Sequence, residues 1–160
     1  FGFRDRGVNA DCGKVLIFIL IFNFLGGYIS SLLSGDQKLV YNSLEKPWFS
    51  PPSIVFPIVW SILYFLLAVA IFLNYKKGGR DFLIYFISMF INFSWSYIFF
   101  AQRLYGIGFL IIIVLIVLCI YLGIRFFKNS KISSLIMLIY LLWLSYAGLL
   151  NYFIWVYNEM

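Results

Sequence analysis

Five long apolar segments constrain the fold of this chain more than any other feature. They cover roughly residues 15–34, 53–75, 81–101, 107–127 and 132–157, and each reaches the length of about 20 residues that crosses a bilayer as a helix. The chain is 64% hydrophobic and only 11% charged, whereas about a quarter of a soluble domain is charged. Backbone hydrogen bonding inside a bilayer further requires helices. The sequence therefore predicts an all-α integral membrane protein.

The connections between these segments are short, except for the first, which covers residues 35–52. Short connections place consecutive helices antiparallel and side by side, so residues 15–160 are predicted to form a single bundle of five transmembrane helices. Residues 1–14 are expected to be a tail outside this bundle, either a frayed end or a remnant of added sequence. A cleaved signal peptide is a weaker interpretation of the first segment, because its apolar run exceeds the usual length.

The basic residues indicate an orientation. One side of the predicted bundle carries nine of the twelve Lys and Arg residues, namely Arg4, Arg6, Lys14, Lys76, Lys77, Arg80, Arg125, Lys128 and Lys131. The other side carries Lys38, Lys46 and Arg103. The positive-inside rule puts the N-terminus in the cytoplasm, with the 35–52 loop and the C-terminus on the opposite side. This bias favours a bacterial cytoplasmic membrane over a mitochondrial outer membrane.

Several classes of function have little support in the composition. The net charge of +6 does not indicate a nucleic-acid partner, because the basic residues lie in short loops between apolar spans. The chain has no histidine, the commonest metal ligand, and its two cysteines have no metal-binding spacing, so neither a metal nor an obligatory cofactor is expected. The centres of the spans lack the ionisable side chains that usually mark ion or proton pathways.

Aromatic and amide side chains occupy the depths of three spans instead. Steps of three or four residues align them on one face of each helix: Phe56, Trp60 and Tyr64; Asn92, Trp95 and Phe99; and Tyr140, Trp143, Ala147, Leu150 and Asn151. One interpretation is ordinary helix packing, with the two asparagines bonding between helices for about 0.6 to 2 kcal/mol each. The other is an aromatic pocket with few polar groups, which suits a flat, largely apolar ligand.

All four prolines of the chain fall near the end of the long loop, at Pro47, Pro51, Pro52 and Pro57. Proline restricts φ and lacks a donor, so the loop is predicted to be stiff. Pro51 and Pro52 suit the entry to a helix, where missing N–H groups cost little. Pro57 is expected to lie past the first turn and to bend the second span.

Three sequence stretches carry a resemblance to a known family. They are "LEKPWFSPPSIVFPIVWSILY" from residue 44, "NFSWSYIFF" from residue 92 and "YLLWLSYAGLLNYFIWVYN" from residue 140. In their order and spacing they resemble the translocator protein family, also called tryptophan-rich sensory proteins and peripheral benzodiazepine receptors. The resemblance covers residues 15–160.

The resemblance implies a ligand and a site. Family members bind porphyrins such as protoporphyrin, and some bind cholesterol or synthetic aromatic ligands, so a membrane receptor, sensor or carrier for porphyrins is expected. The first loop would be a lid over the pocket, carrying Lys46, Pro47, Phe49, Pro51 and Pro52, with Lys46 facing a propionate. The ligand-binding residues would be Phe56, Trp60, Tyr64, Asn92, Trp95, Phe99, Trp143, Ala147, Leu150, Asn151 and Tyr152.

Two alternatives remain open within this resemblance. Certain bacterial members are described as degrading porphyrin in light, and the residues matching their catalytic pair are Trp60 and Tyr152, the second being tyrosine where tryptophan is expected. A lipid or sterol transporter is the other alternative, although Val156 replaces the basic residue of the sterol motif proposed for animal members. The family is commonly dimeric, so a homodimer in contact with membrane lipid is expected.

Overall fold

The fold was described from a computed structural model, which covers residues 2–159, with side chains from residue 12 onward. The elements in chain order are α1 (Gly2–Leu33), α2 (Gln37–Ser43), α3 (Val55–Lys76), α4 (Phe82–Ser96), the π-helical turn η1 (Tyr97–Ala101), α5 (Tyr105–Phe127) and α6 (Lys131–Asn158).

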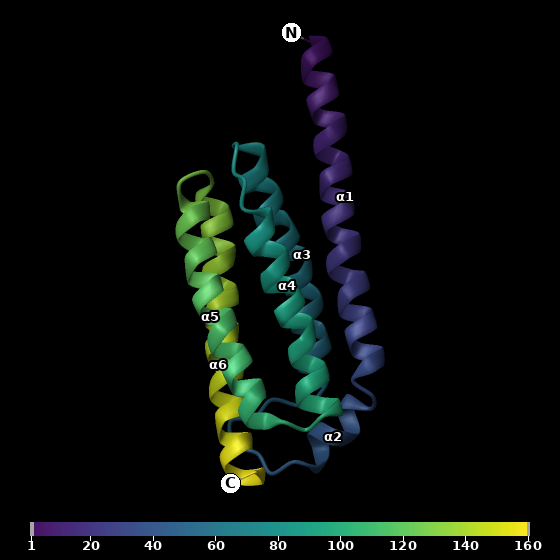
Figure 1. The fold of residues 1–160 in the computed structure, drawn as a ribbon, viewed down its shortest axis with the longest axis vertical. Helices are drawn as coiled ribbons and strands as arrows, with labels where there is room; N and C mark the ends of the chain where they lie inside the picture. Colours follow the sequence, from purple (N-terminus) through teal and green to yellow (C-terminus); the bar gives the residue numbers. More distant parts are fainter. Residues whose placement is uncertain (1, 160) are drawn as a thin grey trace.

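Five of these helical segments are long and apolar enough to cross a membrane, which confirms the predicted five-helix membrane fold. Consecutive helices run antiparallel in one bundle (Figure 1). The α5 and α6 helices form a close pair on one side, α3 and α4 lie next to them, and α1 runs along the other side. The short α2 helix lies at the same end of the bundle as the C-terminus, and the N-terminus lies at the other end.

Two boundaries differ from those predicted. The first helix begins at Gly2, so residues 2–14, expected as a tail, continue α1 beyond the bundle (Figure 1). No proline interrupts this stretch, and extending a helix is easier than nucleating one. The third span is not a single α-helix over residues 81–101, because α4 ends at Ser96 and η1 follows.

The η1 turn changes which side chains are buried. Phe99 and Phe100 are consecutive, yet both are buried, with 2% and 7% of their surface exposed. Neighbouring residues of an α-helix point about 100° apart, and a π-turn, which often occurs at functional sites, alters that direction. Both rings contact Trp95, with centroid distances of 5.0 and 5.9 Å.

Local side-chain bonds set the ends of the helices around the long loop. Gly35 has a φ of +75°, which suits glycine just past the end of α1. Asp36 then caps α2, because its Oδ1 accepts a hydrogen bond of 3.0 Å from the Leu39 N–H. Pro57 lies in the first turn of α3 rather than past it, so it removes no bond from the helical ladder. Its carbonyl accepts a bond of 2.8 Å from the Ser61 hydroxyl.

The opposite end of the bundle is fastened by a polar cluster around Asp81. Arg125 Nε donates to Asp81 Oδ1 at 3.0 Å, and Asn74 Nδ2 donates to Asp81 Oδ2 at 3.1 Å. Asn129 Nδ2 donates in turn to Asn74 Oδ1 at 2.8 Å. These bonds join the α3–α4 and α5–α6 connections, so this end is held by side chains while the α2 end carries the cavities described next.

Candidate ligand-binding site

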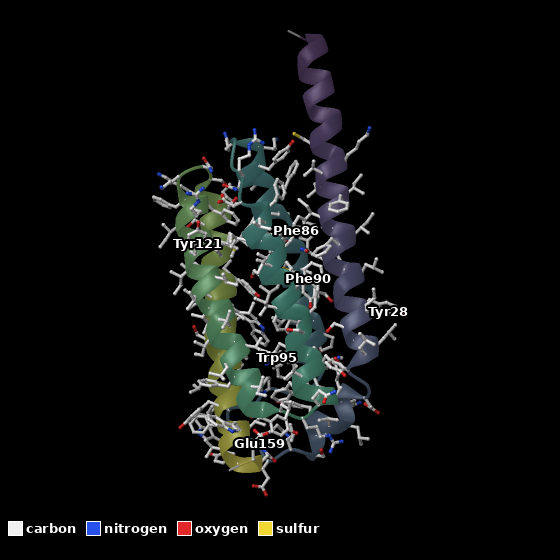
Figure 2. The ribbon with its side chains drawn as sticks, viewed as in Figure 1. Tyr28, Phe86, Phe90, Trp95, Tyr121 and Glu159 are labelled. Atoms are coloured by element: carbon white, nitrogen blue, oxygen red, sulfur yellow. The ribbon has the colours of Figure 1, made fainter. Side chains whose placement is uncertain are left out.

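A cavity of about 290 Å³ lies between α1, α3 and α4 near the α2 end of the bundle. We call it the aromatic cavity, and its lining includes five of the predicted ligand-binding residues, Phe56, Trp60, Tyr64, Asn92 and Trp95. Figure 2 shows Trp95 within the bundle, toward α5, and Tyr28 on α1.

Ring contacts hold the aromatic wall of this cavity in place. Trp60 stacks on Tyr64 with centroids 5.9 Å apart, and meets Trp143 edge-on at 6.1 Å. Phe56 also contacts Trp143 edge-on, at 5.9 Å. Trp143 itself lines neither this cavity nor the small void described below, so it supports the wall from behind.

The polar groups near the cavity differ in whether they have hydrogen-bond partners. Asn92 Nδ2 donates a 2.7 Å bond to the Tyr140 hydroxyl, while the residue also lines the cavity. The Trp143 Nε1 atom is buried and has no hydrogen-bond partner among the described residues. An unsatisfied buried donor costs about 1–3 kcal/mol, and because Trp143 does not line the aromatic cavity, this cost arises in the packing behind the cavity wall.

The other predicted residues lie on the α5–α6 side, where the space is filled. Phe99, Ala147, Leu150 and Asn151 surround a void of only about 20 Å³, room for little more than one water. Asn151 Oδ1 accepts a 3.0 Å bond from Trp95 Nε1, and Asn151 Nδ2 donates a 2.7 Å bond to the Tyr105 carbonyl. This amide is engaged at both ends and acts between helices.

Tyr152 is not brought together with the other predicted site residues. Its side chain is 39% exposed and packs against Phe109 and Trp155, with centroid distances of 5.5 and 6.1 Å. Residues 151 and 152 are adjacent in a helix and so face different directions. With Asn151 directed into the bundle, Tyr152 lies on the outer face, away from the lining of the aromatic cavity that contains Trp60.

The long loop crosses the α2 end of the bundle and is bonded mainly to α6 and to itself. Asn158 Oδ1 accepts from the Glu45 N–H at 3.1 Å, and Asn158 Nδ2 donates to the Glu45 carbonyl at 2.9 Å. The Tyr146 hydroxyl donates to the Phe49 carbonyl at 2.7 Å, and the Phe49 ring packs on Phe153 at 5.8 Å. Residues 45–49 are therefore clasped to the C-terminal half of α6.

The predicted lid residues have structural partners within this loop. Lys46 Nζ donates to the carbonyls of Tyr41 and Leu44 at 2.8 and 3.0 Å, so its ammonium group is engaged within the loop. Pro47 is buried and Pro52 is exposed. The Pro51 carbonyl accepts a 2.6 Å bond from the Tyr41 hydroxyl. Burial raises the pKa of Tyr41 to about 12, so this hydroxyl stays protonated as a donor.

Sequence reasoning missed the contribution of α1 to the site. The aromatic cavity is also lined by Phe24, Gly27, Tyr28 and Ser31 of α1 and by Gln37 of α2. The signal was present, because these four α1 residues recur at intervals of three, one and three, which places them on one face of a helix. Gly27 allows the close approach, since a Cβ there would lie 2.5 Å from Tyr64 Cε2.

The cavity is open on its α1–α3 side. Tyr28 is 63% exposed and Phe24 is 41% exposed, although both lie within the first candidate span. Pro57 and Ser61 of α3 are exposed as well. Because these residues belong to apolar membrane spans, this side of the cavity faces lipid rather than water.

With the site described, comparison with known proteins decides the family. The sequence profile of the TspO/MBR family matches residues 15–156. This chain belongs to the TspO/MBR family. The matched region contains the first four predicted spans, nearly all of the fifth, and every residue that lines the aromatic cavity.

Relatives from this family include archaeal, bacterial and animal proteins. The "Tryptophan-rich protein TspO" of Archaeoglobus fulgidus is 29% identical over 147 residues, which cover 89% of this chain and 94% of the relative. That of Chlorobaculum tepidum is 31% identical over 118 residues, covering 70% and 75%. The "Translocator protein" of Bos taurus is 24% identical over 144 residues, covering 85% of each chain. The predicted family is thereby confirmed.

Proposed function

We propose that this membrane protein binds flat, largely apolar ligands of the porphyrin class in the aromatic cavity, as a receptor, sensor or carrier. The observation that carries the proposal is the cavity itself, walled by Phe56, Trp60, Tyr64 and Trp95. Aromatic faces provide large contact areas for a planar ring. Family membership adds support, since relatives bear names such as "Tryptophan-rich sensory protein" and "Translocator protein".

The size and opening of the cavity bear on how a large ring is held. Its volume of about 290 Å³ is just below the range of about 300–1,000 Å³ for ligand sites. A tetrapyrrole would therefore seat one edge against Trp60 and extend through the open side between α1 and α3. A ligand bound in this way reaches the site from the bilayer, which suits an apolar molecule.

A binding protein is favoured over a light-dependent enzyme by the position of Tyr152. A reaction that requires both Trp60 and Tyr152 needs the two side chains at one ligand, but Tyr152 packs on Phe109 and Trp155 at the outer face. Of these two residues, Trp60 lines the aromatic cavity and Tyr152 does not.

The test is a titration of the purified protein in detergent with protoporphyrin, first in darkness and then in light. Tryptophan quenching and the porphyrin absorbance band are followed together. We expect saturable quenching with an unchanged porphyrin spectrum, a loss of affinity of at least tenfold in Trp60→Ala, and no loss in Tyr152→Phe. The absence of saturable quenching would contradict the proposal, whereas a new absorbance band that depends on Trp60 and Tyr152 would establish the enzyme instead.

We also propose an orientation and an assembly. Arg80 and Lys128 belong to the loops at the end of the bundle that carries the N-terminus (Figure 1). They are two of the nine basic residues, out of twelve, on this side of the bundle. This supports a cytoplasmic N-terminus in a bacterial cytoplasmic membrane. A homodimer is proposed from the family resemblance. Labelling of single cysteines at Lys77 and Trp48 from outside intact cells tests the orientation, and only the Trp48 position should react.

A further inference from the structure

A second cavity adjoins the aromatic cavity beneath α2. It has a volume of about 310 Å³ and shares five lining residues with the aromatic cavity, namely Ser31, Gln37, Phe56, Pro57 and Phe100. The two spaces are therefore neighbours across a common wall of residues, and we call the second the mouth chamber. It lies at the end of the bundle where the predicted spans meet the long loop.

The mouth chamber differs from the aromatic cavity in having charged residues in its lining. Asp36, Gln37 and Lys38 line it from the start of α2. Two of these three side chains have partners: Asp36 Oδ1 accepts from the Leu39 N–H at 3.0 Å, and Gln37 Nε2 donates to Ser96 Oγ at 3.3 Å. A ligand that entered here would meet these polar and charged groups beside the rings of Tyr41, Phe56 and Phe100.

Lys38 is the cation available to such a ligand. Its side chain is exposed. Among the side chains of residues 12–159, the one ion pair joins Arg125 to Asp81 at the other end of the bundle, so Lys38 is not part of an ion pair there. Lys46, by contrast, gives its ammonium group to the Tyr41 and Leu44 carbonyls and lies 4.7 Å from the Tyr41 ring centroid. Arg103 lines neither cavity.

We propose that the site has two parts and selects flat apolar molecules that carry a carboxylate. The apolar body lies in the aromatic cavity against Trp60, and the carboxylate reaches the mouth chamber and pairs with Lys38. This inference rests on the proposed function and specifies its ligand class. It assigns to Lys38 the role of recognising the anionic group.

The carboxylate of Asp36 also lines the mouth chamber, and it shapes the prediction. Its bond to the Leu39 N–H holds it in the cap of α2, so its charge stays near the chamber and reduces the attraction for an anion. Lys38 is also exposed to water, where a charge pair contributes only modestly to binding. The expected effect of removing Lys38 is therefore a moderate loss of affinity, confined to acidic ligands.

The test compares protoporphyrin with its dimethyl ester, which has the same ring without the charges. Dissociation constants are measured by tryptophan quenching for the unmodified protein, for Lys38→Gln, and for Lys77→Gln as a matched control at the opposite end of the bundle. We expect Lys38→Gln to weaken binding of the acid about three- to tenfold and to leave the ester unchanged. Lys77→Gln should change neither, and added salt should reduce the difference between acid and ester.

Three results would overturn the inference. One is equal affinity of the acid for the unmodified protein and Lys38→Gln. Another is an equal change in the affinities of Lys38→Gln for acid and ester, which would indicate a structural role for Lys38. If that equal change occurred only in nanodiscs of anionic lipids, Lys38 would be assigned to lipid headgroups. The third is no saturable binding of either compound to the unmodified protein, which would overturn the proposed function together with this inference.

Discussion

The two sides of Trp95 are built from the same residue types but differ in what they leave empty. Toward α1 and α3, the aromatic cavity has a volume of about 290 Å³. Toward α5 and α6, Phe99, Leu150 and Asn151 close around a void of about 20 Å³. On the closed side Asn151 bonds to Trp95 and to Tyr105, whereas on the open side Asn92 bonds to Tyr140 and also lines the cavity.

This difference shows that deep aromatic and amide side chains can serve either of the two roles considered from the sequence. The closed side illustrates packing, with the amide oxygen and the amide nitrogen of Asn151 each bonded to a neighbouring helix. The open side illustrates a pocket, beside which Gly26 and Gly27 allow α1 to approach the rings of Phe93 and Tyr64 closely. Substitutions on the closed side should therefore mainly lower stability, and substitutions on the open side should mainly weaken ligand binding.

The largest expected effect is on the stability of the closed side. Asn151→Leu leaves the Trp95 Nε1 donor and the Tyr105 carbonyl without their partners, and each buried orphan costs about 1–3 kcal/mol. We expect a loss of about 2–4 kcal/mol in the free energy of unfolding, measured by denaturant titration in detergent. Asn42→Leu, at an exposed position of α2, should cost far less, and equal stability of the two variants would contradict this account.

The next effect concerns binding on the open side. In Gly27→Ala the new Cβ would lie 2.5 Å from Tyr64 Cε2 and displace the ring that stacks on Trp60. We expect protoporphyrin affinity to fall at least tenfold, with a stability loss of about 1–3 kcal/mol from overpacking. Gly123→Ala is the matched control, because its Cβ would lie an ordinary 3.5 Å from Met137 Cβ, between α5 and α6. Equal binding by both variants would argue against the aromatic cavity as the site.

A smaller effect is expected at the boundary between the two sides. Trp143→Phe removes the unpartnered Nε1 donor while keeping an aromatic ring against Trp60. The relief of the orphan donor offsets the lost ring area, so we expect the free energy of unfolding without ligand to change by less than about 1 kcal/mol. Because Trp143 does not line the aromatic cavity, we expect ligand affinity to stay close to that of the unmodified protein, and a loss of tenfold or more would contradict this placement. Trp155 stacks on Phe109 and not on Trp60, so Trp155→Phe should not affect ligand affinity.

The smallest effect is expected in the loop. Asn158→Ala removes both bonds to the Glu45 backbone, but because these groups are exposed we expect less than about 1 kcal/mol of lost stability. Amide exchange at Glu45 should become faster, which hydrogen–deuterium exchange of the 44–50 peptide would detect. An unchanged exchange rate would show that the Phe49 contacts alone hold the loop.

Much of the fold was predictable because apolar length determines the spans and short connections determine their neighbours. The break after Ser96 was not, since no proline or glycine marks the start of η1. The extension of α1 to Gly2 was missed because residues 2–14 carry no apolar periodicity.

The site was predictable in part, because helical spacing shows which side chains share one face of a helix. Spacing along α3 and α4 identified Phe56, Trp60, Tyr64, Asn92 and Trp95, all of which line the aromatic cavity. Spacing cannot tell whether two aromatic faces meet or leave space between them, so Phe99, Leu150 and Asn151 were grouped with them. Tyr152 entered only through the family resemblance, and its helical direction beside Asn151 already argues for an outer face.

The most direct test of the central claim is an experimental structure of the protein with protoporphyrin bound. We predict density for the ring between α1, α3 and α4, in contact with Trp60 and with a carboxylate directed toward α2. A ring seated among Ala147, Leu150 and Asn151, or on the outer face beside Tyr152, would contradict the assignment of the aromatic cavity as the ligand site.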